Sequence, residues 1–217
     1  TGVISPLVAT DFAPTKVVGP GSPDFKPEGN VEKAKQLLEI AKTKCPAEYK
    51  HATEDGIMID ARQSVALNDT IPINEAAYAR VGIKVKYNII KSGYYSTVMN
   101  PAKQNDISSA GWGADWANAS TVLPELFTQE GGFNLSQNWN DAAYPAFKKL
   151  SDAGKNETNR NKQAAIWKQA SQYVMDQYWI IRPVFSKAQD VWGSKVGGVY
   201  YWEPQGTFGF GGLYVKA

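Results

Sequence analysis

The sequence predicts an α/β fold in which helices flank a mixed sheet. Between residues 56 and 110, short apolar stretches alternate with helical patterns. The resulting order, strand–helix–strand–helix–strand, is typical of βαβ units with parallel strands. The 217 residues include 43% hydrophobic side chains, which suffices for one sizeable core or two small ones.

Residues 1–29 are predicted to form an extended lead-in. Proline disfavours regular helix in the segment, because it fixes φ and lacks a backbone donor. We expect the segment either to pack along the surface or to be a connection to a part beyond this chain. The prolines that carry this prediction are Pro6, Pro14, Pro20, Pro23 and Pro27.

The first half of the chain then predicts alternating helices and strands. A helix is expected over Val31–Lys44, with Asn30 as its N-cap and Pro46 beyond its end. The other expected elements are a strand over 56–61, a helix over 73–81 that ends at Gly82, a half-exposed strand over 83–89, a short aromatic helix over 94–99 and a strand over 106–110.

The second half predicts mainly helices, followed by a tail rich in glycine and aromatic residues. The tail, 191–217, is expected to be extended segments and turns. It contains no phosphate loop, because no Gly-Lys-Ser/Thr or helix-opening GxGxxG occurs in it. Before it we expect helices over 123–127, 144–153 and 159–177, a loop over 129–140 and a strand over 180–185.

The stretch 108–116, Ser-Ser-Ala-Gly-Trp-Gly-Ala-Asp-Trp, is the candidate functional site. It follows a predicted strand, and ligands of α/β proteins collect at strand ends. Trp112 and Trp116 offer flat apolar walls, and Gly113 permits close approach to the backbone. Asp115 between them is expected to be desolvated, so it requires a cation such as a ligand ammonium. Alternatively, both tryptophans are core and Asp115 caps the next helix.

Composition excludes several classes of function. The net charge of +2 argues against a large electrostatic surface for nucleic acid or anionic membrane. No apolar run approaches the roughly 18 residues of a membrane helix. Cys45 is the only cysteine and His51 the only histidine, so no intrachain disulfide can form, and we do not assign the two a catalytic dyad. We predict no metal or cofactor.

Gly111-Trp112-Gly113-Ala114-Asp115-Trp116 resembles the Gly-Trp-x-x-Asp-Tyr segment of the extracytoplasmic solute-binding proteins of peptide-type ABC transporters, the oligopeptide- and dipeptide-binding family. Val-Glu-Lys-Ala-Lys-Gln-Leu-Leu at 31–38 and the passage through Gly82-Ile83 into a strand resemble the same family, and the matching order covers roughly 30–190. The chain departs from the family at Arg182 in its Ile-Pro-Val segment. It also lacks a proline after Asp115-Trp116.

The resemblance implies one lobe of a two-lobe periplasmic-binding-protein fold of type II, the second, C-terminal lobe only. Residues 1–29 would be a hinge-side extended lead-in, 30–190 the ligand-binding lobe and 191–217 a tail returning toward the hinge. The implied role is substrate capture without catalysis. A peptide or similar small solute would bind between this lobe and the first lobe of the same full-length protein and pass to an ABC permease. Such proteins work outside the cytoplasm, in the periplasm or as surface lipoproteins, and no signal peptide is recognisable at Thr1.

By the same resemblance, Asp115 anchors the α-ammonium of a peptide and Trp112 and Trp116 form pocket walls. Gly113, Asn138 and Trp139 are the other predicted ligand-binding residues. Ser109 stands where oligopeptide binders carry arginine, so a sugar, nickel complex or opine stays open as the ligand. The alternative class is a glycan-active enzyme pairing Asp115 with Glu125 or Glu130, or a carbohydrate-binding module using loop tryptophans, although no spacing fixes a carboxylate pair.

Overall fold

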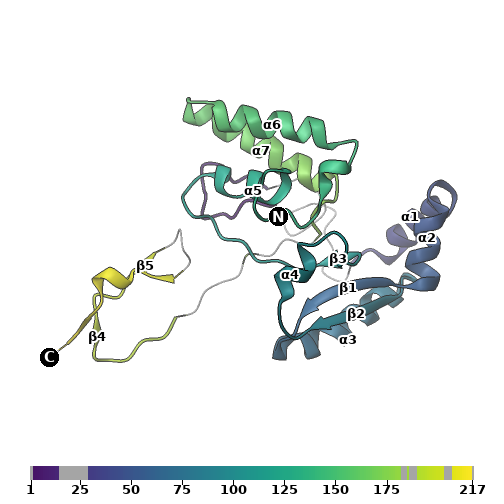
Figure 1. The fold of residues 1–217 in the computed structure, drawn as a ribbon, viewed down its shortest axis with the longest axis horizontal. Coiled ribbons are helices and arrows are strands. Elements are labelled where there is room, and N and C mark those ends of the chain that lie inside the picture. Colours follow the sequence, from purple (N-terminus) through teal and green to yellow (C-terminus); the bar gives the residue numbers. More distant parts are fainter. Residues whose placement is uncertain (1, 15–28, 182–184, 186–189, 203–206, 217) are drawn as a thin grey trace. The chain divides into compact units, whose positions relative to one another are not determined.

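The computed structural model describes residues 2–14, 29–181, 185, 190–202 and 207–216. The chain divides into two compact units (Figure 1). One comprises Phe25–Ala110, and the other comprises Thr1–Asp24 together with Gly111–Ala217. The border at residue 110 falls inside the predicted 30–190 lobe, and the three-part division made from the sequence stays a prediction.

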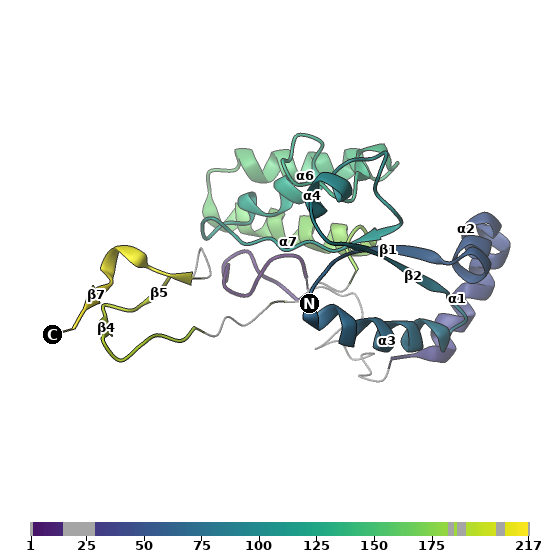
Figure 2. The ribbon, with the colours of Figure 1, turned by 60° about the horizontal axis from the view of Figure 1, so that its bottom comes forward.

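The unit Phe25–Ala110 contains the predicted sheet. Strands β1 (Ile57–Arg62), β2 (Val85–Ile90) and β3 (Ile107–Ser108) pair in parallel in the order β2-β1-β3. β3 is shorter than predicted, with only two residues in the ladder. Figure 2 shows helix α3 running alongside β1 and β2, as the crossover between two parallel strands requires. The predicted βαβ organisation is confirmed.

Helix α1 (Val31–Lys44) has the predicted bounds, because the Asn30 side chain accepts a hydrogen bond from the Lys33 amide. The helix predicted over 73–81 is wrong at its start. Helix α3 spans Val65–Ala79 with Pro72 inside it, and the Ser64 side chain caps it by accepting from the Leu67 amide. Three further helical segments complete this unit, α2 (Pro46–Lys50), the π-helix η1 (His51–Asp55) and α4 (Tyr94–Val98).

The other unit is built around helices α6 (Tyr144–Asn156) and α7 (Arg160–Asp176), which lie side by side in both ribbon views (Figures 1 and 2). The short helices η2 (Ala119–Thr121), α5 (Leu123–Phe127) and η3 (Asn138–Asn140) precede them. Their apolar faces meet in one core, whose members include Trp167, Phe147, Leu123, Phe127 and Val174. The three helices predicted in this half are therefore confirmed, apart from shifts of up to three residues at their ends.

Residues 2–14 belong to this core, which corrects the extended surface lead-in for the part that the structure describes. The segment bends through turns, and Val3, Ile4 and Val8 are buried against α5 and α7 side chains. Pro20, Pro23 and Pro27 lie outside the described residues. The segment packs into the core because burying Val3 and Ile4 is favourable. The prolines, on which the prediction was based, do not indicate this burial.

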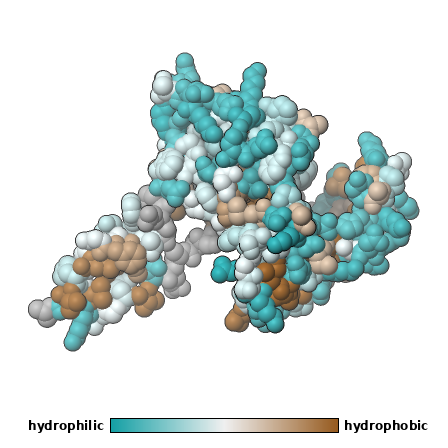
Figure 3. All heavy atoms as spheres, viewed as in Figure 1, coloured by the Kyte–Doolittle hydropathy of each residue, from teal (hydrophilic) through white to brown (hydrophobic). Residues whose placement is uncertain are grey.

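The tail forms two small antiparallel sheets, as expected from its extended pattern. β4 (Val196–Gly197) pairs with β7 (Tyr214–Val215), and β5 (Tyr201–Trp202) pairs with β6 (Thr207–Phe208), with a 3-10 turn, η5 (Phe210–Gly212), between β6 and β7. Apolar side chains of this segment lie at the surface (Figure 3). The predicted strand over 180–185, with Arg182, lies largely outside the described residues. No helix among the described residues is long and apolar enough to span a membrane.

Candidate functional site

Thr121 organises the Trp–Asp turn. Its side chain is 1% exposed. The Thr121 hydroxyl donates to Asp115 Oδ2 at 2.9 Å and accepts from the Asp115 amide at 3.3 Å. The Thr121 carbonyl accepts from Trp112 Nε1 at 2.7 Å. One buried residue therefore holds both the carboxylate and the first indole of the turn.

Asp115 is exposed, so the expectation that it is desolvated is wrong. The helix-cap alternative is also wrong, because Asn118 caps η2 by accepting from the Ser120 amide. The Asp115 carboxylate bonds only to Thr121 among the hydrogen bonds and ion pairs of the described residues, and none of their lysines or arginines pairs with it. It is an oriented negative charge at the surface.

Both tryptophans of the turn are exposed, Trp112 by 40% and Trp116 by 55%, which excludes the core alternative. The Trp112 ring lies 5.0 Å from the Phe133 ring at an interplanar angle of 34°. Trp116 Nε1 donates to Ser120 Oγ at 3.2 Å. Gly113 is exposed, and a Cβ added to it would meet open space, so no contact with the described residues requires a glycine there. The four predicted residues of the turn thus lie together.

Phe133 is a member of this surface that the sequence reading did not single out. The loop 128–133 folds back on α5, with the Phe133 amide donating to the Glu125 carbonyl at 3.2 Å and the Gly132 amide to Glu125 Oε2 at 3.1 Å. A Cβ on Gly131 would lie 2.4 Å from two carbonyl oxygens, so this fold of the loop requires glycine. The only sequence signal for this contact was the aromatic Phe133 directly after Gly131 and Gly132.

Asn138 is buried, and its amide is used inside the chain. Its Nδ2 donates to the Phe127 carbonyl at 2.9 Å, and its Oδ1 accepts from Asn134 Nδ2 at 2.8 Å and from Ser136 Oγ at 2.9 Å. We therefore assign it a structural role instead of the predicted ligand contact. Trp139 is partly buried in η3, and among the described residues it makes no side-chain hydrogen bond or ring contact with the Trp–Asp turn.

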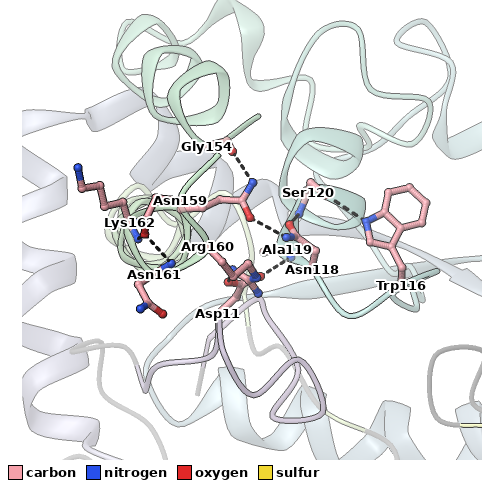
Figure 4. A network of polar contacts seen from close by, with 11 residues as sticks. Asp11, Trp116, Asn118, Ala119, Ser120, Gly154, Asn159, Arg160, Asn161 and Lys162 are labelled. Atoms are coloured by element: carbon pink, nitrogen blue, oxygen red, sulfur yellow. Dashed lines mark hydrogen bonds and ion pairs between the residues drawn. The ribbon is translucent and has the colours of Figure 1, made fainter. Parts of the chain in front are cut away.

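The N-terminal segment holds η2, the short helical turn that carries Thr121. Asp11 is fully buried, accepts from the Ala119 amide at 2.7 Å and pairs with Arg160 at 2.5 Å. Figure 4 shows Asp11 between Ala119 of η2 and Arg160 at the start of α7. Asn118 Nδ2 donates to Gln163 Oε1 at 2.8 Å, which ties the same η2 turn to α7 a second time. The helical turn that carries Thr121 is therefore fixed from two sides.

In the other unit, a buried network holds the end of β3. Asp60 is fully buried and accepts from Asn88 and Asn105 side chains at 2.8 and 2.7 Å. The Tyr94 hydroxyl accepts from the Ser109 amide at 2.8 Å and donates to the Ser109 carbonyl at 2.7 Å. These contacts order the residues that precede Gly111 in the chain.

Comparison with known proteins identifies the fold. No family model and no curated protein matches the sequence. The dipeptide-binding protein of Pseudoalteromonas sp. SM9913 in complex with Met-Leu is similar with a TM-score of 0.68 and 16% identity, over 99% of this chain and 39% of that one. The murein tripeptide-binding protein MppA, a periplasmic protein in its unliganded open form, gives 0.64 and 18% over 99% and 39%. OppA of Burkholderia pseudomallei gives 0.64 and 16% over 96% and 40%.

The chain has the fold of the periplasmic peptide-binding proteins. It spans about two fifths of the length of these neighbours, as one lobe of that fold would. The predicted fold class and the family resemblance are therefore confirmed at the level of the fold. Sequence identities of 16–18% to these neighbours show a shared fold and nothing finer.

Within this peptide-binding-protein fold, the residues of the enzyme alternative are engaged elsewhere. Glu125 Oε2 accepts from the Gly132 amide, and Glu130 lies 3.7 Å from Lys148 Nζ. Among the described residues, neither glutamate has a recorded contact with Asp115, and no group of three histidine, cysteine, aspartate or glutamate side chains is arranged to hold a metal ion. His51 bonds to Asp106 and not to Cys45.

Proposed function

We propose that this chain is the substrate-capture part of an ABC importer and that it binds a peptide or similar small solute through the solute's ammonium group. Asp115 would accept the ammonium, and the exposed rings of Trp112 and Trp116 would line the ligand. The observation that carries the proposal is the Asp115 carboxylate itself, which is exposed, oriented by Thr121 and without a lysine or arginine partner among the described residues.

The chemistry of the turn favours a cation over other ligands. An ammonium donates charge-assisted hydrogen bonds to a carboxylate, which are about twice as strong as neutral ones. Indole faces within about 6 Å of a cation add an electrostatic attraction. The exposed tryptophans that precede and follow Asp115 in the chain, Trp112 and Trp116, would provide such faces. The N-terminus of a peptide combines these two features, because it carries a free ammonium next to a side chain that can be apolar.

The structural neighbours support the importer role. Their names describe a dipeptide-binding protein, a periplasmic murein tripeptide-binding protein and the substrate-binding domain of an oligopeptide ABC transporter. We propose the same extracytoplasmic setting for this chain, in a periplasm or on the cell surface as a lipoprotein. Its partners would be a second lobe of the same protein and a membrane permease. We assign it no catalytic activity.

Calorimetry with matched peptides tests the proposal. The complete protein would be titrated with Met-Leu and with N-acetyl-Met-Leu, which lacks the ammonium. Asp115→Asn is expected to weaken Met-Leu binding about 30- to 4,000-fold, since truncating one partner of a charge pair that the bound ligand covers costs about 2–5 kcal/mol. Asp69→Asn removes an exposed carboxylate on α3 and is the control. Equal affinity of wild type and Asp115→Asn for Met-Leu would remove Asp115 from the site.

A further inference from the structure

The role of Thr121 goes beyond capping or packing. Its side chain is buried, yet its hydroxyl uses its only proton on Asp115 Oδ2 and a lone pair on the Asp115 amide. A buried threonine that needed only a hydrogen-bond partner would be satisfied by a carbonyl of its own turn. Here both hydroxyl bonds go to a single residue, Asp115, whose carboxylate is exposed.

We propose that Thr121 is the positioning residue of the ammonium site, an inference that rests on the proposed function. Its hydroxyl holds Oδ2 of Asp115 and leaves Oδ1, to which no hydrogen bond from a described residue is recorded, for the ligand. Its carbonyl holds the Trp112 indole. Thr121 therefore sets the orientation of the carboxylate relative to the aromatic wall, and with it which cations fit between them.

Thr121 can do this because its own backbone is fixed. The Thr121 amide donates to the Asn118 carbonyl at 3.2 Å, within the 3-10 turn η2. The first residue of that turn, Ala119, donates to the buried Asp11 carboxylate. Asp115, by contrast, lies on an exposed turn, where its side chain would otherwise exchange between staggered rotamers. The hydroxyl bond thus joins a fixed element to a carboxylate on an exposed turn.

The rotamer of Asp115 in the ligand-free protein gives a direct test. Three-bond couplings across the Asp115 Cα–Cβ bond are expected to show one rotamer in wild type and rotamer averaging in Thr121→Val. Thr121→Ser keeps the hydroxyl and is expected to restore the single rotamer. Valine is nearly isosteric with threonine and keeps the carbonyl, so the Trp112 indole proton should keep its wild-type chemical shift. A single Asp115 rotamer in Thr121→Val would overturn the proposal.

The binding test uses Met-Leu and N-acetyl-Met-Leu as probes of the complete protein. Thr121→Val is expected to weaken Met-Leu about tenfold, as the loss of one hydrogen bond to a charged group predicts. Thr121→Ser should bind as wild type does, and N-acetyl-Met-Leu affinity should not change. Equal weakening of both peptides by Thr121→Val would indicate a general structural defect and would overturn the positioning role.

The same series separates this inference from the proposed function. If Asp115→Asn weakens Met-Leu and Thr121→Val does not, the positioning role is wrong while the ammonium site stands. If Asp115→Asn has no effect, the ammonium site itself is wrong. The coupling measurement needs no ligand, so it decides whether Thr121 orients Asp115 even where Met-Leu does not bind.

Discussion

Asp11 and Arg160 form an ion pair of 2.5 Å although 149 positions separate them in the chain. The Asp11 carboxylate is fully buried, and its second oxygen accepts from the Ala119 amide. The contact joins the N-terminal segment to the start of α7 and to the turn that carries Thr121. The candidate site therefore depends on a residue that lies far from it in sequence.

Replacing Asp11 by alanine is expected to lower the free energy of unfolding by about 3 kcal/mol. The substitution leaves the Ala119 amide without its acceptor and Arg160 without its partner, and removing one member of a buried pair costs about 3–5 kcal/mol. Asp11→Asn keeps an acceptor and should cost less. Urea unfolding followed by circular dichroism measures both. Wild-type stability of Asp11→Ala would show that the pair does not support the fold.

Gly154 in α6 is expected to tolerate no side chain. A Cβ there would lie 2.6 Å from the buried Trp167 ring. Alanine in a helix gains about 1 kcal/mol over glycine, but overpacking a rigid core costs about 1–3 kcal/mol. We therefore expect Gly154→Ala to be destabilised on balance, with a lower melting temperature in calorimetry. Gly113→Ala, which meets open space, is the control and should melt within a degree or two of wild type.

The loop glycines 131 and 132 make a second matched pair. Gly131→Ala would drive a methyl group into the Pro124 and Glu125 carbonyls, whereas at Gly132 the nearest atom is 3.6 Å away. We expect Gly131→Ala to displace the loop, to separate Phe133 from Trp112 and to change tryptophan fluorescence. Gly132→Ala should leave the spectrum unchanged. Identical spectra for both variants would mean that the loop does not hold the two rings together.

These elements show how far sequence alone leads. Asn30 and the spacing of apolar residues predicted α1, and the βαβ pattern predicted the parallel sheet, because both signals are local. The start of α3 was missed, because the helix continues through Pro72 back to its cap at Ser64 although the proline removes one hydrogen bond.

The Trp–Asp turn was found from its composition, but its internal contacts were not predictable. Nothing local to Asp115 indicates that a threonine six positions later holds it, or that Phe133 lies against Trp112. The burial of Asp11 depends on a pair formed across 149 positions, which no periodicity encodes. Tertiary contacts decided each of these cases, whereas the sequence signals were local.

Asp106 is expected to make stability depend on pH in the acid range. Burial opposes its ionisation, but the Met58 amide bond and the hydrogen bond and charge of His51 together lower the pKa of the Asp106 carboxyl. A carboxyl whose pKa is lower in the folded state stabilises the protein above its ordinary pKa, and this contribution is lost as the pH falls through the folded value. The loss should occur below about pH 4.

Urea unfolding between pH 2 and 6 measures this dependence. Asp106→Asn should flatten the curve at its acid end, while Asp55→Asn, whose partner His51 lies 3.9 Å away, should change it less. If the Asp106→Asn and wild-type curves keep the same slope below pH 4, the carboxylate does not contribute as described.

Asn138 provides the sharpest test between a ligand contact and a structural role. Its Nδ2 donates to the Phe127 carbonyl and its Oδ1 accepts from Asn134 and Ser136, so Asn138→Asp keeps the shape and loses the donor. Because this places a carboxylate against a buried carbonyl, we expect a loss of about 2 kcal/mol or more in unfolding free energy. Asn140→Asp, an exposed site in the same 3-10 turn, should have little effect. Full stability of Asn138→Asp combined with weakened Met-Leu binding would contradict the structural role and return Asn138 to the ligand site.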